Sequence, residues 1–404
     1  MKLPASDWTE RRGLTALIAA LDGKARFVGG AVRDSLLGVA VKDVDIATPL
    51  LPEDVMARLE AASIKVIPTG IDHGTVTAVL PDGPVEITTL RRDVSTDGRR
   101  ATVAFSDDWQ EDAARRDFTI NALFADPETL EIFDYFGGLE DLEQRRIRFI
   151  GSAAERIAED HLRIMRYFRF LARFGLHELD ADAYRACVDA APKLELLSRE
   201  RVAEELLKLL ATDDPCLAVN KMLDGNIFDH IIARTDPQAA AILRRLVSRE
   251  QAHAITPAAI RRLVALLPKN ADQAAAIAKS LKLSRKLQRA ILDRVLEATG
   301  RETPIAIATD IRVLAYRTGV EAARDIALLF ADDQALSGLL ARLEDWQPPL
   351  FPLTGGDLIA RGLKPGPIVA RTLASIEQAW IDNGFPDEEW LTEYVEGLDF
   401  SPPT

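Results

Sequence analysis

A chain of 404 residues with 48% hydrophobic residues is long enough for two or more domains and too apolar to be disordered throughout. No apolar run reaches the roughly 18 residues of a membrane span, and the two cysteines follow no metal-ligand spacing. We therefore expect a reduced, cytoplasmic protein with no membrane partner and no implied protein partner. The net charge of −13 argues against a protein that coats nucleic acid non-specifically, although it permits a local basic surface.

The predicted secondary structure changes character near residue 150. Before this point, short β-branched runs such as "GTVTAVL" and "VEITTL" alternate with a helical stretch, "LPEDVMARLEAA", which Pro52 opens at its first turn. After it, Leu, Ala, Arg and Glu recur with the 3.6-residue period of helices, and strand signals nearly disappear. The pattern predicts a mixed α/β head followed by a long helical region.

A glycine turn opens the first predicted helix in "FVGGAVRDSLLG". Gly29 and Gly30 let the backbone approach an anion closely, and the helix predicted from Ala31 to Leu37 points its free N–H groups the same way. Arg33 lies in the first turn of that helix, and Gly38 follows its end. These residues predict a phosphate cradle.

Two closely spaced carboxylates follow this turn in the sequence. Asp43 and Asp45 lie two residues apart in a predicted strand, so their side chains share one face, and Val44 points the other way. Glu86 lies on a second apolar strand, "PVEITTL". A solvated strand end and a wet sheet face are the plain interpretations. The alternative is that the two strands are neighbours, so that three carboxylates hold divalent cations.

Two segments follow before the chain becomes wholly helical. Arg91–Gln110 has weak periodicity and turn residues, and we expect a long mobile loop. Between Arg145 and Arg173 there are eight arginines against three acids, a local reversal of the overall charge. In "EDHLRIMRYFRFLARF" the arginines at 163, 166, 169 and 173 share one helical face, opposite an apolar one.

Five ordered motifs resemble the class II tRNA nucleotidyltransferases. They are "GGAVRDSLLG…KDVDIAT", "EITTLR", "RRDFTINAL", "FDYFGGLEDL" and "EDHLRIMRYFRF". This family comprises the CCA-adding enzymes and the bacterial poly(A) polymerases, within the polymerase β superfamily. The resemblance is dense over residues 25–210 and thins to "PLTGGDLIARGLKPGPIVA" at 352–370.

The resemblance implies an α+β fold, with a nucleotidyltransferase head that carries a mixed β-sheet and an all-helical neck, body and tail. It implies that Asp43 and Asp45 are catalytic metal ligands, with Glu86 as the third acid of a two-metal Mg²⁺ site. The expected divisions are an N-terminal helix at 1–24, the head at 25–150, the neck at 151–215, the body at 216–350 and a tRNA-contacting tail at 351–404.

The start of the arginine-rich helix offers a way to choose bases without a template. Cytosine and adenine each present an amino donor beside a ring-nitrogen acceptor, whereas guanine and uracil present a carbonyl beside an N–H donor. A carboxylate only accepts and a guanidinium only donates, so Asp160 and Arg163 complement C and A and repel G and U. The family assigns this role to the EDxxR motif. The plain alternative is an i,i+3 ion pair between Asp160 and Arg163 on a solvated helix.

Further nucleotide contacts are predicted on both sides of the pocket. Arg115 and Arg116 are expected at the triphosphate, and Asp117 and Asn121 are candidates for the sugar hydroxyls; the plain alternative is a charged helix start. The remaining predicted nucleotide-binding residues are Arg166 and Arg169. The helix "LSRERVAEELLKLL", with Ser198 at its N-cap, is expected to support this pocket without contacting substrate.

The sequence thus predicts an enzyme that adds CCA to the 3′ end of tRNA from CTP and ATP and releases pyrophosphate. A bacterial poly(A) polymerase, or a partial enzyme that adds only CC or only A, would carry the same catalytic motifs. The acidic C-terminus, "DEEWLTEYVEGLDFSPPT", disfavours poly(A) synthesis, because a basic extension would be needed to hold generic RNA. The remote alternative is a catalytically inactive RNA-binding protein, which the intact acids disfavour.

Overall fold

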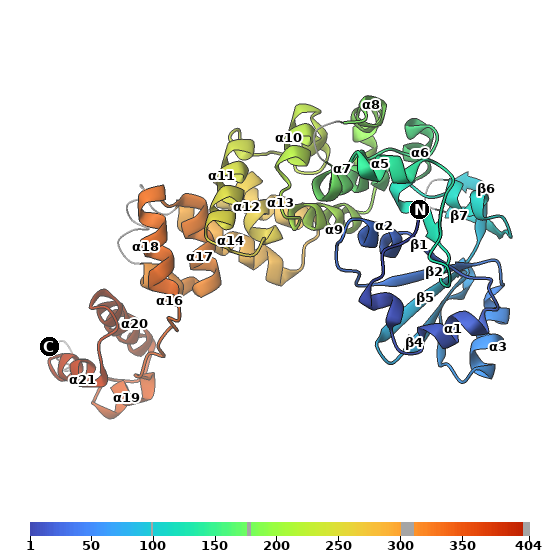
Figure 1. Cartoon of the computed structure of the whole chain (residues 1–404). Coiled ribbons are helices and arrows are strands. Elements are labelled where there is room, and N and C mark those ends of the chain that lie inside the picture. Colours follow the sequence, from blue (N-terminus) through green and yellow to red (C-terminus); the bar gives the residue numbers. More distant parts are fainter. Residues whose placement is uncertain (98–99, 176–178, 300–310, 399–404) are drawn as a thin grey trace. The chain divides into compact units, whose positions relative to one another are not determined.

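The computed structural model describes residues 1–97, 100–175, 179–299 and 311–398 (Figure 1). It forms two compact units, Met1–Thr235 with Ser280–Lys282, and Asp236–Lys279 with Leu283–Thr404. Among the helices of the described residues, none is both long and apolar enough to cross a membrane. The finer five-part division stays a prediction.

A seven-stranded mixed sheet organises the start of the first unit, as predicted. Its strand order is β3-β4-β5-β2-β1-β8-β9, and β2 and β5 run parallel while the other neighbours are antiparallel. The strands are β1 (Arg26–Val28), β2 (Val44–Thr48), β3 (Val66–Gly70), β4 (Thr75–Leu80), β5 (Gly83–Thr89), β8 (Leu123–Ala125) and β9 (Ile132–Asp134).

Short helices pack on this sheet and support its central strands. Helix α3 has Pro52 at its first turn and buries Val55 and Leu59, and it packs on β3 and β4 with α1 beside it (Figure 1). Helix α2 packs on β1, β2 and β8. The helical elements here are η1 (Asp7–Glu10), α1 (Leu14–Ala20), α2 (Gly30–Leu36), α3 (Pro52–Ala61), η2 (Ile71–His73), α4 (Trp109–Ala114), η3 (Thr119–Asn121) and α5 (Gly138–Glu143).

The prediction of a long loop at Arg91–Gln110 is wrong for most of that segment. Strands β6 (Arg91–Asp97) and β7 (Arg100–Phe105) form a separate antiparallel pair, and α4 begins at Trp109. A register shift between Asp93 and Ser95 interrupts the period-2 alternation, which explains why the strand pattern is weak in the sequence. The Arg91 side chain donates to the His73 carbonyl over 2.7 Å, so the pair is anchored to the turn after β3. Residues 98 and 99, which join the strands, lie outside the described residues.

The rest of the first unit is helical and is built around α7. This helix turns Ile164, Phe168 and Leu171 inward, as the periodicity predicts, and packs on α9 and α10. Ser198 caps α9, since its side chain accepts from the Arg201 N–H. The elements are α6 (Ala153–Glu159), α7 (Leu162–Phe174), α8 (Ala181–Ala190), η4 (Ala191–Leu196), α9 (Arg199–Leu210), α10 (Cys216–Asp224) and η5 (Ile227–His230).

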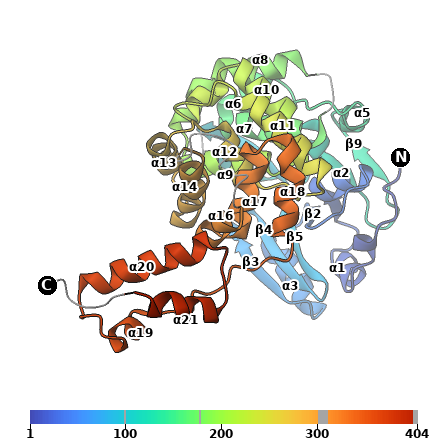
Figure 2. The ribbon, with the colours of Figure 1, turned by 90° about the vertical axis from the view of Figure 1, so that its left-hand side faces the viewer.

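The described residues of the second unit form helices joined by loops. Its first part is fastened by buried ion pairs, in which Asp325 accepts from Arg261 and Arg294 over 2.6 Å. The three last helices lie beside one another around Leu358, Trp380 and Leu391 (Figure 2). The helices are α11 (Ala239–Ala252), α12 (Ala259–Leu266), α13 (Ala271–Ser280), α14 (Arg285–Thr299), α16 (Ile311–Thr318), α17 (Val320–Phe330), α18 (Asp333–Leu343), α19 (Gly355–Ala360), α20 (Pro367–Asp382) and α21 (Glu388–Glu396).

Candidate active site

A polar cavity of about 600 Å³ in the first unit collects most of the predicted site residues. That volume lies within the roughly 300–1,000 Å³ common for small-molecule sites. Asp43 and Arg169 line an adjoining cavity of about 700 Å³ instead, which shares Gly30, Arg33 and Asp45 with the first. The predicted residues that line the first cavity are Gly29, Gly30, Arg33, Asp45, Glu86, Arg115, Arg116, Asp117, Asn121, Asp160, Arg163 and Arg166.

The glycine turn forms one wall of this cavity. Gly29 connects β1 to α2 and has a φ of +67°, which residues other than glycine rarely adopt. A Cβ on Gly29 would lie 3.5 Å from Nη1 of Arg116. Arg33 lies behind the turn, 5% exposed, and donates to the carboxylate of Asp34 and to Oδ1 of Asn121. Burial lowers the pKa of Arg33, and the charge of Asp34 opposes that shift.

Two carboxylates stand side by side on the sheet, as predicted for neighbouring strands. Asp45 of β2 and Glu86 of β5 are direct partners in the parallel register. Burial, followed by the charges of Glu86 and Asp43, raises the pKa of Asp45 to about 6, although Arg116 opposes the shift. Among the described residues, neither Asp45 nor Glu86 has a hydrogen-bond or ion-pair partner, which leaves their oxygens available to a cation.

Asp43 differs from these two carboxylates. It precedes β2, is exposed, and lines the adjoining cavity. In the part of the chain that the structure describes, no three acidic, histidine or cysteine side chains are grouped closely enough to hold an ion. The Asp45–Glu86 pair therefore fits a divalent cation by its donor chemistry, and a third ligand from Asp43 stays a prediction.

The raised pKa of Asp45 has a consequence for the metal-free protein. Because the folded-state pKa, about 6, lies above the ordinary 3.8, the fold binds this proton more tightly than the unfolded chain does. The free energy of unfolding should therefore fall as the pH rises from about 4 to about 6, and it should stay at the lower value above that range. In EDTA at pH 7.5 we expect Asp45→Asn to raise the free energy of unfolding by roughly 1–3 kcal/mol, with little difference at pH 4.

Denaturant unfolding at the two pH values measures this effect. Addition of a divalent cation should stabilise the wild type more than the asparagine variant, because the variant has only one of the two carboxylates that bind the cation. Equal stability of the two metal-free proteins at pH 7.5 would contradict the assignment of a buried, repelled carboxylate.

A buried aspartate that the sequence reasoning missed holds the two predicted triphosphate arginines. Asp112 of α4 is 1% exposed and accepts from Arg115 over 2.8 Å and from Arg116 over 2.9 Å. It also accepts from the backbone N–H of Arg91, at the start of β6. Burial alone would raise the pKa of Asp112, but the charges of Arg116 and Arg115 outweigh it and hold that pKa below its usual value. The i,i+3 and i,i+4 spacing was the signal for this cluster.

Asp117 and Asn121, the predicted sugar contacts, are already part of a hydrogen-bonded chain. Asp117 accepts from the Asn121 amide and from the Arg166 guanidinium, while Asn121 accepts from Arg33. Burial would raise the pKa of Asp117, and the charge of Arg166 with these hydrogen bonds lowers it. This series of hydrogen bonds joins the glycine turn to helix α7. A contact between Asp117 and ribose stays a prediction, and the Asp117 side chain is buried.

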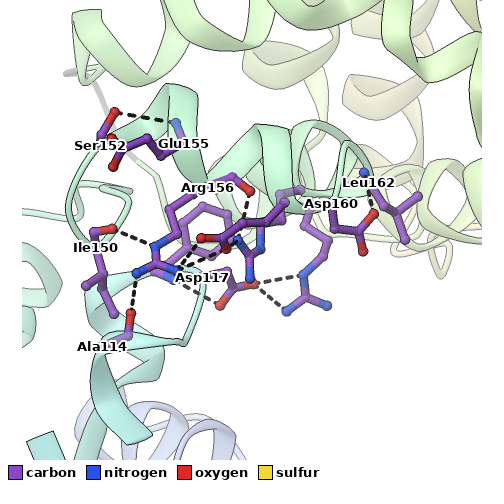
Figure 3. Close-up of polar contacts among 12 residues, drawn as sticks. Ala114, Asp117, Ile150, Ser152, Glu155, Arg156, Asp160 and Leu162 are labelled. Carbon is purple, nitrogen blue, oxygen red and sulfur yellow. Dashed lines mark hydrogen bonds and ion pairs between the residues drawn. The ribbon is translucent and has the colours of Figure 1, made fainter. Parts of the chain in front are cut away.

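Asp160 and Arg163 line the cavity where α6 ends and α7 begins. Figure 3 shows Asp160 beside Leu162 at this point. Among the described residues their side chains do not pair with each other, so the simple i,i+3 ion pair is absent. Asp160 accepts from the Leu162 N–H over 3.0 Å and from Arg201 over 2.7 Å. Arg163 donates through Nη1 to Glu159 and to the Arg156 carbonyl. Its Nε and Nη2 are free of described hydrogen-bond partners, so a donor edge is left for a ligand.

Helix α9 contributes more to the site than the sequence predicted. Arg201 lines the cavity and holds Asp160, so it is a contact candidate that sequence reasoning placed only in support. Its neighbour Glu200 pairs with Lys282 over 3.0 Å within the same unit. The arginine face of α7 also finds partners in this unit, since Arg169 pairs with Glu205. Arg169 lines the adjoining cavity.

Comparisons with known proteins agree on one family. The model of the "Poly A polymerase head domain" matches residues 25–148, and that of the "Probable RNA and SrmB-binding site of polymerase A" matches 178–243. The mitochondrial CCA tRNA nucleotidyltransferase 1 of Mus musculus is 34% identical over 397 residues, covering 95% of this chain and 89% of that protein. The CCA-adding enzyme of Streptococcus sanguinis is 32% identical, covering 97% and 98%. The crystal structure of the Bacillus stearothermophilus CCA-adding enzyme with CTP superposes with a TM-score of 0.71 at 29% identity, covering 94% and 96%.

Proposed function

This chain belongs to the family of CCA tRNA nucleotidyltransferases, and we propose that it adds CCA to the 3′ end of tRNA, using CTP and ATP and releasing pyrophosphate. The observation that carries the proposal is one cavity lined by the Asp45–Glu86 pair, the Gly29–Gly30 turn and the Asp160/Arg163 edge. A metal platform, a phosphate cradle and a base-selecting edge in one cavity are what template-independent addition requires. Relatives whose names give the same activity support it along nearly the whole chain.

Nucleotidyltransferases generally use divalent metal ions, and we propose Mg²⁺ here. Asp45 and Glu86 would hold it, with Asp43 as the predicted third ligand of a two-metal site. Their oxygen donors suit a hard cation, and their mutual repulsion is the kind that a cation relieves. When bound, the metal supplies activation of the attacking hydroxyl and neutralisation of charge on the leaving pyrophosphate.

The chain's own residues orient the nucleotide. The backbone at Gly29 and Gly30 would approach the triphosphate at the start of α2, and Arg115 and Arg116, which line the same cavity, would neutralise it. Asp112 keeps both guanidiniums in place before the nucleotide arrives. Such preorganisation lowers the barrier because the charges need not rearrange during the reaction.

Base choice is assigned to the other end of the cavity. The carboxylate of Asp160 would accept the amino group of cytosine or adenine, and the free edge of Arg163 would donate to the adjacent ring nitrogen. Guanine and uracil would meet like polarity at both positions, and a desolvated mismatch of this kind discriminates strongly.

The RNA substrate in this proposal is tRNA. The helices beyond the head would hold tRNA through its shape and phosphates, and the tail at residues 351–404 is proposed as one contact.

Similar proteins include bacterial enzymes and vertebrate enzymes named as mitochondrial. We propose a cytoplasmic location for this chain, which fractionation and immunodetection would test.

Primer extension on a tRNA that ends at its discriminator base tests the function. Two additions with CTP alone, and a third followed by arrest with CTP and ATP, are expected for CCA addition. A long ladder with ATP alone would instead indicate a poly(A) polymerase. Arrest after CC would indicate a partial enzyme, and no extension with either nucleotide would indicate an inactive RNA-binding protein.

A further inference from the structure

Arg156 lies outside the cavity and links the groups that form two of its walls. This α6 residue uses all three guanidinium nitrogens: Nε donates to the Ile150 carbonyl over 3.0 Å, and Nη2 donates to the Ala114 carbonyl over 2.6 Å. Nη1 donates to both oxygens of Glu159, over 2.8 and 3.0 Å. Figure 3 shows Ala114 and Ile150 facing Arg156 from the head side. Its side chain is only 17% exposed, so these contacts are largely shielded from water.

The contact with Ala114 reaches the phosphate end of the cavity. Ala114 is the last residue of α4, and Arg115 and Arg116 follow it directly. The same helix carries Asp112, which pairs with both arginines. Arg156 therefore fixes the backbone from which the two predicted triphosphate arginines extend.

The contact with Glu159 reaches the base end. Glu159 accepts from Arg156 and from Arg163, and Arg163 donates to the Arg156 carbonyl as well. Both of these bonds use Nη1 of Arg163, which lines the cavity, so they orient the guanidinium and leave Nε and Nη2 for a ligand. Loss of the Arg156 side chain would leave Glu159 held by Arg163 alone, and it would loosen Arg163 without removing it.

We infer that Arg156 is a positioning residue that sets the Arg163 edge for base choice and ties it to the triphosphate arginines. The inference rests on the proposed function, because it assumes that Arg163 reads the base. Arg156 itself does not line the cavity, and its effect must pass through Glu159 and the end of α4.

Arg156→Ala tests the inference, with Arg148→Ala as the matched control. Arg148, like Arg156, donates to both a carboxylate and a carbonyl. Its Nε donates to Asp141 and its Nη2 donates to the Phe136 carbonyl, but Arg148 does not line this cavity. For Arg156→Ala we expect the ratio of kcat/KM for CTP over UTP to fall about tenfold, as loss of one charged positioning contact predicts. The KM for CTP should rise more than kcat falls. Arg148→Ala should leave that ratio unchanged.

The conservative variant and a double mutant separate positioning from folding. Arg156→Lys keeps the charge near Glu159 but cannot span all three partners, so it should restore part of the selectivity. In an Arg163→Ala background, Arg156→Ala should cause no further loss of selectivity. An equal fall in kcat/KM for all four nucleotides would overturn the inference and indicate a structural role.

The same series distinguishes failure of the inference from failure of the proposed function. If Arg163→Ala itself keeps full selectivity against UTP and GTP, the base-reading assignment fails. If Arg163→Ala loses selectivity while Arg156→Ala keeps it, only the positioning role fails.

Discussion

Replacing Asp45 by alanine is expected to slow nucleotide addition by about 10³-fold or more, while the affinity for tRNA stays nearly unchanged. Asp45 is the partly buried member of the carboxylate pair, and Glu86 alone would bind a divalent cation weakly. A bound metal contributes several kcal/mol of charge stabilisation in the transition state, and each 1.36 kcal/mol is a factor of ten in rate. RNA binding depends on positive charge and shape, which this substitution does not remove.

Single-turnover extension of a tRNA without CCA measures the rate, and filter binding measures the affinity. Asp82→Ala is the control, because Asp82 is an acid at the turn between β4 and β5 that pairs with Arg12 outside the cavity. It should extend tRNA at the wild-type rate. A loss of tRNA affinity in Asp45→Ala, or a rate within tenfold of the wild type, would contradict the metal role.

The sequence was sufficient to predict those parts of the site that depend on local residue spacing within one strand, turn or helix. The two-residue spacing around Val44 predicted the face of the strand from which Asp45 extends. The neighbouring position of the Glu86 strand was one of the alternatives, and its parallel register came from the structure. The glycine turn was predictable because two adjacent glycines favour a turn, and Gly29 has the positive φ that few other residues adopt. The apolar and arginine faces of α7 likewise follow from helical geometry.

Contacts between distant segments could not be predicted in this way. Arg201 meets Asp160 across 41 positions, and Arg156 meets the Ala114 carbonyl across 42. Such partners depend on how α6 and α9 pack beside the head, and no local periodicity encodes that packing. The β6–β7 pair was missed for a different reason, since a register shift masks the alternation that reveals strands.

The same limit applies to side-chain pairing at the base end. Local spacing left an ion pair between Asp160 and Arg163 open as the plain alternative, whereas each is held by another residue, Arg201 or Glu159. The consequence is functional, because an ion pair between the two would cover the edges that a base must reach. With separate partners, both side chains are oriented and their inner edges remain on the cavity wall.

Asp160→Ala is therefore expected to relax base choice, with the preference for CTP over UTP falling by roughly 10- to 100-fold. The substitution removes the acceptor for the amino group of cytosine and the repulsion toward the uracil carbonyl. Arg201 would lose its partner at the same time, and its freed guanidinium would favour a carbonyl-bearing base. The prediction applies to discrimination, so addition of CTP should persist at a reduced rate.

Competition between CTP and each of the other nucleotides in single-turnover extension measures this change directly. Asp180→Ala is the matched control, because Asp180 also accepts a backbone N–H at a helix end, that of Ala183, but does not line the cavity. It should cost stability through the lost cap, about 1 kcal/mol, and leave the CTP-to-UTP preference intact. Unchanged selectivity in Asp160→Ala would mean that the carboxylate only fastens Arg201. Base choice would then have to come from Arg163 and the shape of the cavity, and the Arg163→Ala measurement would decide between them.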